Sequence, residues 1–559
     1  MLNTDKIWIR DIAEICAAHG MDKAVISPGS RSAPLVIAFS RQPEIECIPI
    51  VDERAAAFFA LGMAQQTAKP VALICTSGSA TLNFAPALAE AYYQRIPLIT
   101  FTADRPDEFV DQRDGQTIRQ RNIYSNYIRK SFHLPVNCSA EVDRWYAARI
   151  ISEAIHHTQY PVAGPVHVNV PLREPLHKLA HYTAYQKPRI IRLVKNRFIL
   201  PAEQQKELLH IWSASTKKML LIGSNPPDRR LQRLIKKLAV DPSVSILTET
   251  TSNITTEGIV RCIDPTLEAI DKKQYSAFSP QVLVTLGGEI ISRKVKAFLR
   301  SHPPAEHWHI DPAADTADTF QCLTRLVPVD APTFLQLLTA AAPVHSDYRS
   351  RWTHAYQQAQ KIRTRTLASS PYCDLTVFGE LFKHLPSGCN LHLGNSSPIR
   401  YSNLFELHPD ITVNCNRGVS GIDGVTSTAA GAAYVNKKLT VLITGDLSFF
   451  YDSNALWNKA LPANLRIIVI NNAGGNIFRI IPGPSELDEF EPLFEAPHEL
   501  TAEYLAKTFN LPYYFCDNMH QLQQQVKSFF RPSPKAAILE IKTPAHTSAE
   551  VLKNYMNMK

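Results

Sequence analysis

The chain has 559 residues, of which 45% are apolar and 20% are charged. A chain of this length is expected to form about three or four domains with full hydrophobic cores, which excludes a disordered protein and a small disulfide-stapled scaffold. The net charge of +8 is modest for this size and is spread along the chain. A nucleic-acid-binding tail is therefore not expected, whereas anionic substrates are compatible with this charge.

Residues 1–6 carry charge from the start, and no stretch approaches about 18 consecutive apolar residues. The ten cysteines are scattered between Cys16 and Cys516 and form no CxxC pair, zinc-ligand spacing or disulfide framework. These features predict a protein without a targeting or membrane-spanning segment that works in a reducing cytoplasm.

Residues 1–170 alternate short aliphatic runs with longer amphipathic ones, which is typical of a parallel sheet covered by helices. A proline-spaced basic stretch at 171–192 indicates a linker. A second α/β pattern follows, then a charged helical passage at 348–365, and a third α/β pattern begins near Cys373. The expected strands are 24–27, 71–76, 98–102, 166–170, 219–222, 282–286 and 308–310, and the first helices are 7–19 and 53–66. The predicted fold class is α/β, with three doubly wound parallel-sheet domains at 1–180, 195–345 and 355–559.

The third region repeats features of the first. Three segments in which a strand runs into a polar loop recur in the same order, at nearly constant offsets of 365, 367 and 369 residues. This pattern predicts a duplicated domain with another domain inserted between the copies. The alternative is the general likeness of all parallel α/β units. The paired positions are Gly29 with Gly394, Gly78 with Gly445, and Ala103 with Asn472.

Polar side chains follow two expected strands of the third region, where ligands of open α/β sheets bind. Asp446 comes directly after the strand 440–444, and Asn472 follows the strand 465–470. A carboxylate, an amide oxygen and the nearby Gly474 carbonyl are hard oxygen ligands suited to Mg²⁺. An Asp at a strand end alone also serves as a helix cap, but the Asp and Asn pair 26 residues apart is a more specific signal.

This pair resembles the diphosphate-binding signature of thiamine-diphosphate-dependent enzymes, although the usual third Gly is Leu447 here. The chain is also similar to the branch of that family that acts in menaquinone biosynthesis. The similar segments lie in both outer domains, in order, and are 26–32, 51–56, 102–106, 116–120, 416–424, 445–448 and 471–478.

The resemblance implies a synthase that decarboxylates 2-oxoglutarate on thiamine diphosphate and adds the resulting succinyl semialdehyde carbanion equivalent to isochorismate. It implies Mg²⁺, with Mn²⁺ as the alternative ion, and a homodimer or tetramer whose active sites are shared between chains. The first domain is expected to bind the pyrimidine end of the cofactor and the third its diphosphate. The implied cofactor residues are Glu53, Ser396, Ile422, Gly445, Asp446, Leu447, Ser448, Asn472, Gly474 and Ile477, and the implied metal ligands are Asp446, Asn472 and Gly474.

Glu53 is the expected catalytic residue. It opens a helix whose next residues, 55–63, are almost wholly apolar, so its carboxyl group is expected to be sequestered with a raised pKa. The resemblance implies that it holds a proton against the aminopyrimidine ring. The alternative is a favourable interaction with the helix dipole.

Several arginines follow expected strands, and converging guanidinium groups suit a substrate with several carboxylates. Taken singly, each, Arg119 included, is also compatible with a solvated surface charge. The resemblance implies Ser30, Arg31, Arg105, Gln116, Arg293 and Lys294 for isochorismate, Ser396, Arg400 and Arg417 for the distal carboxylate of 2-oxoglutarate, and Phe478 as a further substrate contact.

The chain lacks the motifs of several other enzyme classes, since it contains no HExxH, GxSxG or GxGxxG sequence. Two alternatives stay open. One is another thiamine-diphosphate 2-oxo-acid decarboxylase or an acetohydroxyacid-type synthase, and the other is a non-catalytic paralogue. Arg400 and Arg417 argue against the first, and the intact set of Glu53, Asp446 and Asn472 argues against the second.

Overall fold

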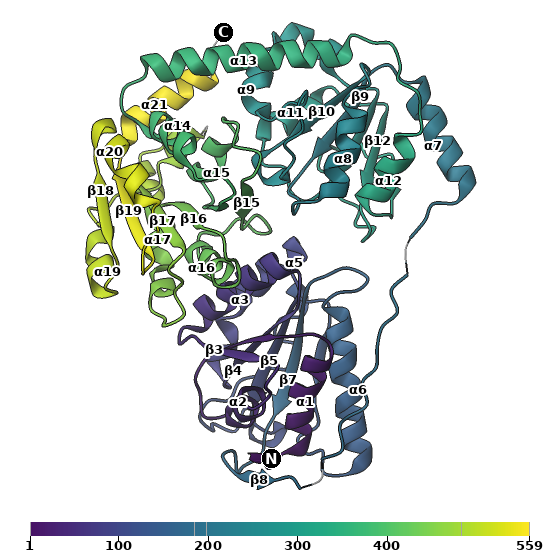
Figure 1. The fold of residues 1–559 in the computed structure, drawn as a ribbon, viewed down its shortest axis with the longest axis vertical. Coiled ribbons are helices and arrows are strands. Elements are labelled where there is room, and N and C mark those ends of the chain that lie inside the picture. The colour runs from purple at the N-terminus through teal and green to yellow at the C-terminus, as the bar shows by residue number, and fades with distance from the viewer. Residues whose placement is uncertain (1, 184, 197, 482, 558–559) are drawn as a thin grey trace.

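The computed structural model of the chain describes residues 2–183, 185–196, 198–481 and 483–557. Figure 1 shows three α/β units, with the first below and the middle and third side by side above it. Within the described residues, the strands of all three large sheets are parallel to their neighbours. The predicted fold class is confirmed.

The first sheet has the strand order β3-β2-β4-β5-β7-β6. Its strands are β2 (Lys23–Ile26), β3 (Glu46–Pro49), β4 (Val71–Cys75), β5 (Leu98–Asp104), β6 (Ser131–His133) and β7 (Pro165–Pro171). Its helices are α1 (Ile7–Ala18), α2 (Ala33–Ser40), α3 (Glu53–Thr67), α4 (Ser79–Leu82), α5 (Ala85–Gln94) and α6 (Glu141–His157). A small antiparallel pair, β1 (Leu2–Thr4) with β8 (Leu179–His181), lies at the far end of this unit.

The middle sheet has the order β10-β9-β11-β12-β13. Its strands are β9 (Lys218–Ile222), β10 (Val244–Thr248), β11 (Val282–Leu286), β12 (Glu306–Ile310) and β13 (Arg325–Val327). Its helices are α7 (Ala202–Ala214), α8 (Arg229–Leu238), α9 (Ile263–Glu268), α10 (Tyr275–Phe278), α11 (Arg293–Ser301) and α12 (Ala331–Leu338). The long helix α13 (Tyr348–Ser369) connects this unit to the third (Figure 1).

The third sheet has the order β15-β14-β16-β17-β19-β18. Its strands are β14 (Asn390–Leu393), β15 (Thr412–Cys415), β16 (Thr440–Gly445), β17 (Leu465–Asn471), β18 (Tyr513–Cys516) and β19 (Ala537–Lys542). Its helices are α14 (Asp374–His384), α15 (Ser397–Ser402), α16 (Val425–Val435), α17 (Asp446–Tyr451), α18 (Ile477–Ile480), α19 (Ala502–Thr508), α20 (Met519–Phe529) and α21 (Ala545–Met556).

The first and third sheets share one topology. When their six strands are numbered in chain order, both sheets run in the order 2-1-3-4-6-5. The matched loops noted in the sequence follow equivalent strands, since β4 corresponds to β16 and β5 to β17. The shared topology supports the predicted duplication.

Helices α3 and α16 join the first and third units into one hydrophobic core. Every residue of α3 from Ala55 to Ala64 is buried, and α16 is buried from Val425 to Ala433. Glycines permit the close contact, because a Cβ added at Gly431 would lie 1.9 Å from the backbone oxygen of Phe59. The start of α3 is thereby held against the loops of the third unit.

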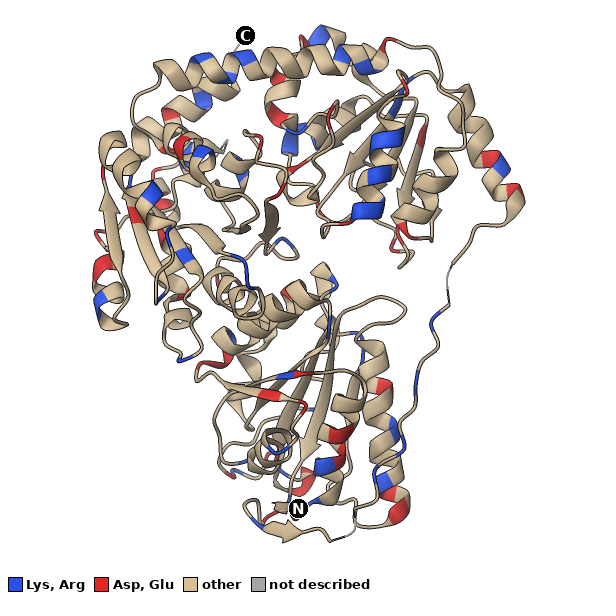
Figure 2. Cartoon of the chain, viewed as in Figure 1, with Lys and Arg blue, Asp and Glu red and all other residues tan. Residues whose placement is uncertain are grey.

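Charge is less evenly spread than the sequence analysis predicts. Figure 2 shows a row of basic residues on α8. Arg229, Arg230, Arg233, Lys236 and Lys237 are all exposed there, while the leucines and isoleucine of the opposite face are buried. None of the described helices combines the length and apolarity needed to cross a lipid bilayer.

Candidate functional site

The ends of strands β16 and β17 meet at Asp446. This residue opens α17, is 2% exposed, and its carboxylate accepts hydrogen bonds from the backbone N–H groups of Leu447 (2.7 Å) and Gly474 (3.1 Å). The second bond joins the two loops that the sequence predicts to be neighbours. The geometry places Asp446 beside the loop that carries Asn472 and Gly474.

A hydrogen bond to the buried carboxylate of Asp374 orients the side chain of Asn472. Its amide nitrogen donates to Asp374 Oδ2 at 3.2 Å, and Thr543 donates to the other Asp374 oxygen at 2.6 Å. Burial raises the pKa of Asp374. With its nitrogen engaged in this way, Asn472 offers its amide oxygen as the ligand atom.

Two backbone positions in these loops adopt conformations that L-residues rarely take. Ala473 has φ 64°, and Ser396, which directly precedes α15, has φ 70°. Such positions cost about 1–3 kcal/mol each and gather at ligand-binding sites. Ser396 also accepts a hydrogen bond from Arg400 through its carbonyl oxygen at 2.7 Å.

The same region holds buried polar atoms without a hydrogen-bond partner among the described residues. Both amide atoms of Asn476 are buried in this way. His498 Nε2 lies 3.4 Å from Asp446 Oδ2 but makes no hydrogen bond. A Cβ added at Gly445 would meet nothing within 4 Å, so there is open space beside the Asp446 backbone. Unused donors and acceptors beside hard oxygen ligands fit a diphosphate group with a divalent cation.

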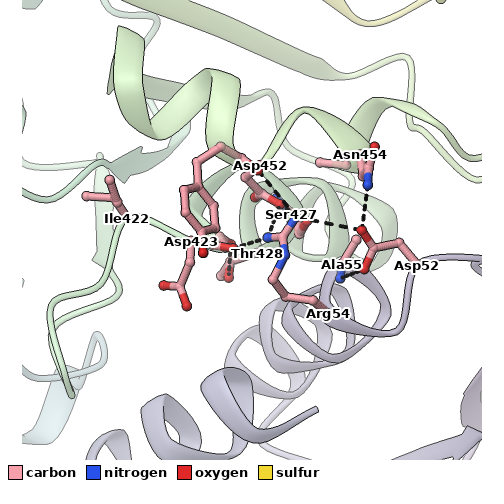
Figure 3. A network of polar contacts seen from close by, with 12 residues as sticks. Asp52, Arg54, Ala55, Ile422, Asp423, Ser427, Thr428, Asp452 and Asn454 are labelled. Carbon is pink, nitrogen blue, oxygen red and sulfur yellow. Dashed lines mark hydrogen bonds and ion pairs between the residues drawn. The ribbon is translucent and has the colours of Figure 1, made fainter. Parts of the chain in front are cut away.

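Glu53 stands in the sequence between Asp52 and Arg54, and both of these residues contact the third unit (Figure 3). Asp52 caps α3 by accepting from Ala55 N at 3.0 Å, and its other carboxylate oxygen accepts from Asn454 Nδ2 of the third unit at 2.7 Å. Arg54 donates to Asp452 Oδ1 at 2.9 Å and to the carbonyl oxygen of Asp423, the neighbour of Ile422. The start of α3 is therefore attached to the loop that carries Ile422.

The expected rise in the pKa of Glu53 is confirmed. Its side chain is partly buried, and loss of solvation raises the pKa of its carboxyl group, with a further contribution from the Asp52 charge. A protonated Glu53 is favoured more here than on an open surface. Ser448 donates to the Ile422 carbonyl at 3.0 Å and so links this loop to the Asp446 helix.

Three of the predicted arginines lie close enough to influence one another. Burial, together with the positive charges of Arg417 and Arg293, lowers the pKa of Arg400 to about 10. Arg417 donates to Asn395 Oδ1 at 2.9 Å. In the part of the chain that the structure describes, none of these three guanidinium groups forms an ion pair with a carboxylate. The arrangement is suited to binding an anion.

Other predicted substrate residues already have carboxylate partners. Arg31 pairs with Glu174 at 3.2 Å, and Arg105 pairs with Asp114 and also lies 3.6 Å from Glu174. The two cations are neighbours because both contact Glu174, and burial together with the Arg105 charge lowers the pKa of Arg31.

Three more predicted substrate positions lie outside these two groups of arginines. Ser30 and Gln116 are exposed, as is Arg293 of the first group, and Lys294 pairs with Glu268 and donates to the Met556 carbonyl at 3.1 Å. Arg119 lies on the surface with its side chain 83% exposed. Among the described contacts, none connects the Arg31 and Arg105 pair to Arg400 or Arg417.

Sequence reasoning missed four polar residues around this site, which are Glu90, Asp374, Asn476 and His498. Glu90, Asp374 and His498 lie in no motif, because each reaches the site from a separate element and only the fold reveals its contact. Asn476 lies within a similar segment and was detectable there only as part of the Asn-Asn-Ala-Gly-Gly-Asn run.

Comparison with known proteins shows which family the chain belongs to. A family model described as the thiamine pyrophosphate enzyme N-terminal TPP binding domain matches residues 9–123. Proteins named 2-succinyl-5-enolpyruvyl-6-hydroxy-3-cyclohexene-1-carboxylate synthase are similar over nearly the whole chain. Those of Flavobacterium johnsoniae and Flavobacterium psychrophilum are 42% and 43% identical, each over 98% of both chains, and that of Bacteroides fragilis is 35% identical over 99% of both. The chain therefore belongs to the family of 2-succinyl-5-enolpyruvyl-6-hydroxy-3-cyclohexene-1-carboxylate synthases.

Proposed function

We propose that the protein is a thiamine-diphosphate-dependent transferase that decarboxylates 2-oxoglutarate and adds the four-carbon unit to isochorismate in menaquinone biosynthesis. The observation that carries this proposal is the pair formed by Arg400 and Arg417, with Arg293 nearby. Two cations without carboxylate partners among the described residues, next to Ser396, fit a dicarboxylic 2-oxo acid better than a monocarboxylic one.

Asp446, Asn472 and the Gly474 carbonyl would hold Mg²⁺ or Mn²⁺, and Asn476 offers a donor to the diphosphate. When bound, thiamine diphosphate supplies the nucleophilic carbon and electron sink that decarboxylation of a 2-oxo acid requires. Glu53 would keep a proton on its carboxyl group and present it to the pyrimidine end. Its raised pKa and its place beside the Ile422 loop support that role.

The remaining predicted contacts belong to the same proposal. Leu447, Ser448 and Ile477 would line the cofactor beside Gly445, and Phe478 would face the substrate. Arg31 and Arg105, with Ser30, Gln116, Arg293 and Lys294, would bind isochorismate. Because Arg31 and Arg105 are neutralised by Glu174 and Asp114, binding would require these carboxylates to be displaced.

The test is to incubate purified protein with thiamine diphosphate, Mg²⁺ and 2-oxoglutarate, with and without isochorismate, and to identify the products by mass. We expect the coupled product only when all four components are present. Turnover of pyruvate but not of 2-oxoglutarate would favour another 2-oxo-acid decarboxylase. Cofactor binding without any turnover would favour a non-catalytic paralogue.

We further propose that two chains exchange their first units in a homodimer or tetramer. Within the single chain, α3 packs on the chain's own α16. The segment between β8 and α7 has no helix or strand in its described residues and runs along the outside of the molecule, so the same contact is open to a second copy (Figure 1). The ten cysteines, all free thiols, fit the proposed cytoplasmic location.

Mixing two inactive variants tests this exchange. Glu53→Gln and Asp446→Ala subunits, dissociated and reassembled in equal amounts, should regain about a quarter of full activity if sites are shared across a two-fold axis. Persistent inactivity, with mixed dimers demonstrated by mass spectrometry, would leave each site within one chain.

A further inference from the structure

Glu90 is a buried acid that the proposed chemistry does not use. It lies on α5 of the first unit and is 1% exposed. Burial raises the pKa of its carboxyl group, which hydrogen-bond donors and the charge of Arg417 counteract. Burying a carboxylate is costly unless its oxygens accept hydrogen bonds.

Both Glu90 oxygens bind the backbone of the third unit. Oε1 accepts from Gly418 N at 2.6 Å and Oε2 from Val419 N at 2.8 Å, while Gln94 of the same helix donates to Oε1. The approach is close, because a Cβ added at Gly418 would lie 2.6 Å from the Glu90 backbone oxygen. The carboxylate thus clamps two consecutive N–H groups of one loop.

The clamped loop begins with Arg417. A second clamp holds its other side, since Asn395 Nδ2 donates to the carbonyl oxygens of Asn416 at 2.6 Å and Gly421 at 2.7 Å. The Arg417 side chain donates through one nitrogen to Asn395, and its buried Nε has no hydrogen-bond partner in the described part of the chain. The loop is therefore held from two sides while the guanidinium keeps a donor available for a ligand.

We propose that Glu90 is a positioning residue that sets Arg417 for the substrate carboxylate, so that docking of the first unit on the third completes the 2-oxo-acid site. This inference rests on the proposed function, because the proposed function assigns Arg417 to the carboxylate of 2-oxoglutarate. Glu90 itself touches neither substrate nor cofactor. Its effect passes through the backbone of residues 417–419.

A double-mutant cycle tests the coupling. Glu90→Gln should raise the KM for 2-oxoglutarate about tenfold while kcat and the affinity for thiamine diphosphate stay within about twofold. In an Arg417→Ala background the same change should add little. The matched control is Glu380→Gln, which alters another buried glutamate, on α14, and should leave all three quantities unchanged. Additive losses, an unchanged KM, or a parallel loss of cofactor affinity would overturn the proposal.

Amide hydrogen exchange gives a readout that does not depend on the reaction. Exchange at Gly418 and Val419 should be faster in Glu90→Gln than in the wild type, and equal rates would overturn the proposal. If Glu90→Gln does not fold, Gly418→Ala replaces it, because the added Cβ would push the loop away from α5. This variant should show the same rise in KM and the same faster exchange. A wild type that binds cofactor but does not turn over 2-oxoglutarate would reject the proposed function, while the exchange rates still decide the role of Glu90.

Discussion

At the scale of single residues, Glu53 is the position where a small chemical change should have the largest effect. Glu53→Gln keeps the size and hydrogen-bonding atoms of the side chain but removes the acid. We expect thiamine diphosphate to bind normally while turnover falls by roughly 10²–10⁴, the usual loss when acid–base catalysis is removed. The control is Glu14→Gln, which changes a partly buried glutamate on α1 of the same unit. Near-normal turnover in Glu53→Gln would assign Glu53 to stabilising the helix dipole.

Arg400 should decide which 2-oxo acid is used. Its guanidinium has a pKa lowered to about 10 by burial and by two neighbouring cations, and a substrate carboxylate would relieve that repulsion. Arg400→Ala should cost about 1.5–3 kcal/mol of binding, seen as a rise of roughly one to two orders of magnitude in the KM for 2-oxoglutarate. Any weak use of pyruvate should change little. Arg119→Ala, at an exposed arginine, is the control, and equal losses with both acids would point to a structural role.

At the scale of elements, hydrophobic patterning predicts the strands closely. The expected 282–286 strand is observed as β11 without change, and the 98–102 and 166–170 strands are each extended to seven residues as β5 and β7. Alternation of aliphatic and amphipathic runs is a local property, so it can be seen in sequence. Contacts between segments that are distant in the sequence are not local. For this reason neither the pairing of Arg31 with Glu174 within the first unit nor the contact of Glu90 with the third unit could be predicted.

The part of the site formed by residues that follow strands was predictable from the sequence, and the part formed by other elements was not. Asp446 and Asn472 follow strands, so their proximity follows from the sheet, and a hydrogen bond from Gly474 to Asp446 confirms that the two loops meet. Asp374, which orients Asn472, comes from a helix about 100 residues earlier, and no spacing rule connects them.

The crossing of α3 and α16 predicts an effect of packing on cofactor binding. In Gly431→Ala the new Cβ would lie 1.9 Å from the Phe59 oxygen, and overpacking of this kind typically destabilises by about 1–3 kcal/mol. We expect weaker thiamine-diphosphate affinity and a lower urea midpoint. Gly115→Ala is the control for the midpoint, because a Cβ there meets nothing within 4 Å. Wild-type values for both quantities in Gly431→Ala would contradict the packing account.

At the scale of the whole molecule, buried histidines predict acid sensitivity. Burial lowers the pKa of His167 and of His392 from 6.5 to about 3. At a pH between about 3 and 6.5, these histidines bind protons in the unfolded chain but not in the folded one. The free energy of unfolding therefore decreases as the pH falls below about 6.5, by up to about 1.4 kcal/mol per pH unit for each histidine. The urea midpoint should therefore fall between neutral pH and about pH 5. His392→Gln should show a smaller fall and His354→Gln, at an exposed histidine, an unchanged one; equal falls in all three proteins would contradict this origin.

The central claim is that the loops at Asp446 and Asn472 hold thiamine diphosphate through a divalent cation, and calorimetric titration of the cofactor tests it most directly. We expect wild-type protein to bind thiamine diphosphate in the presence of Mg²⁺ and to lose that binding when the cation is chelated. Asp446→Ala should fold, as judged by circular dichroism, but should not bind, because it removes a proposed cation ligand and the acceptor for Gly474 N–H. Wild-type affinity in folded Asp446→Ala protein, or binding that persists without a divalent cation, would contradict the account.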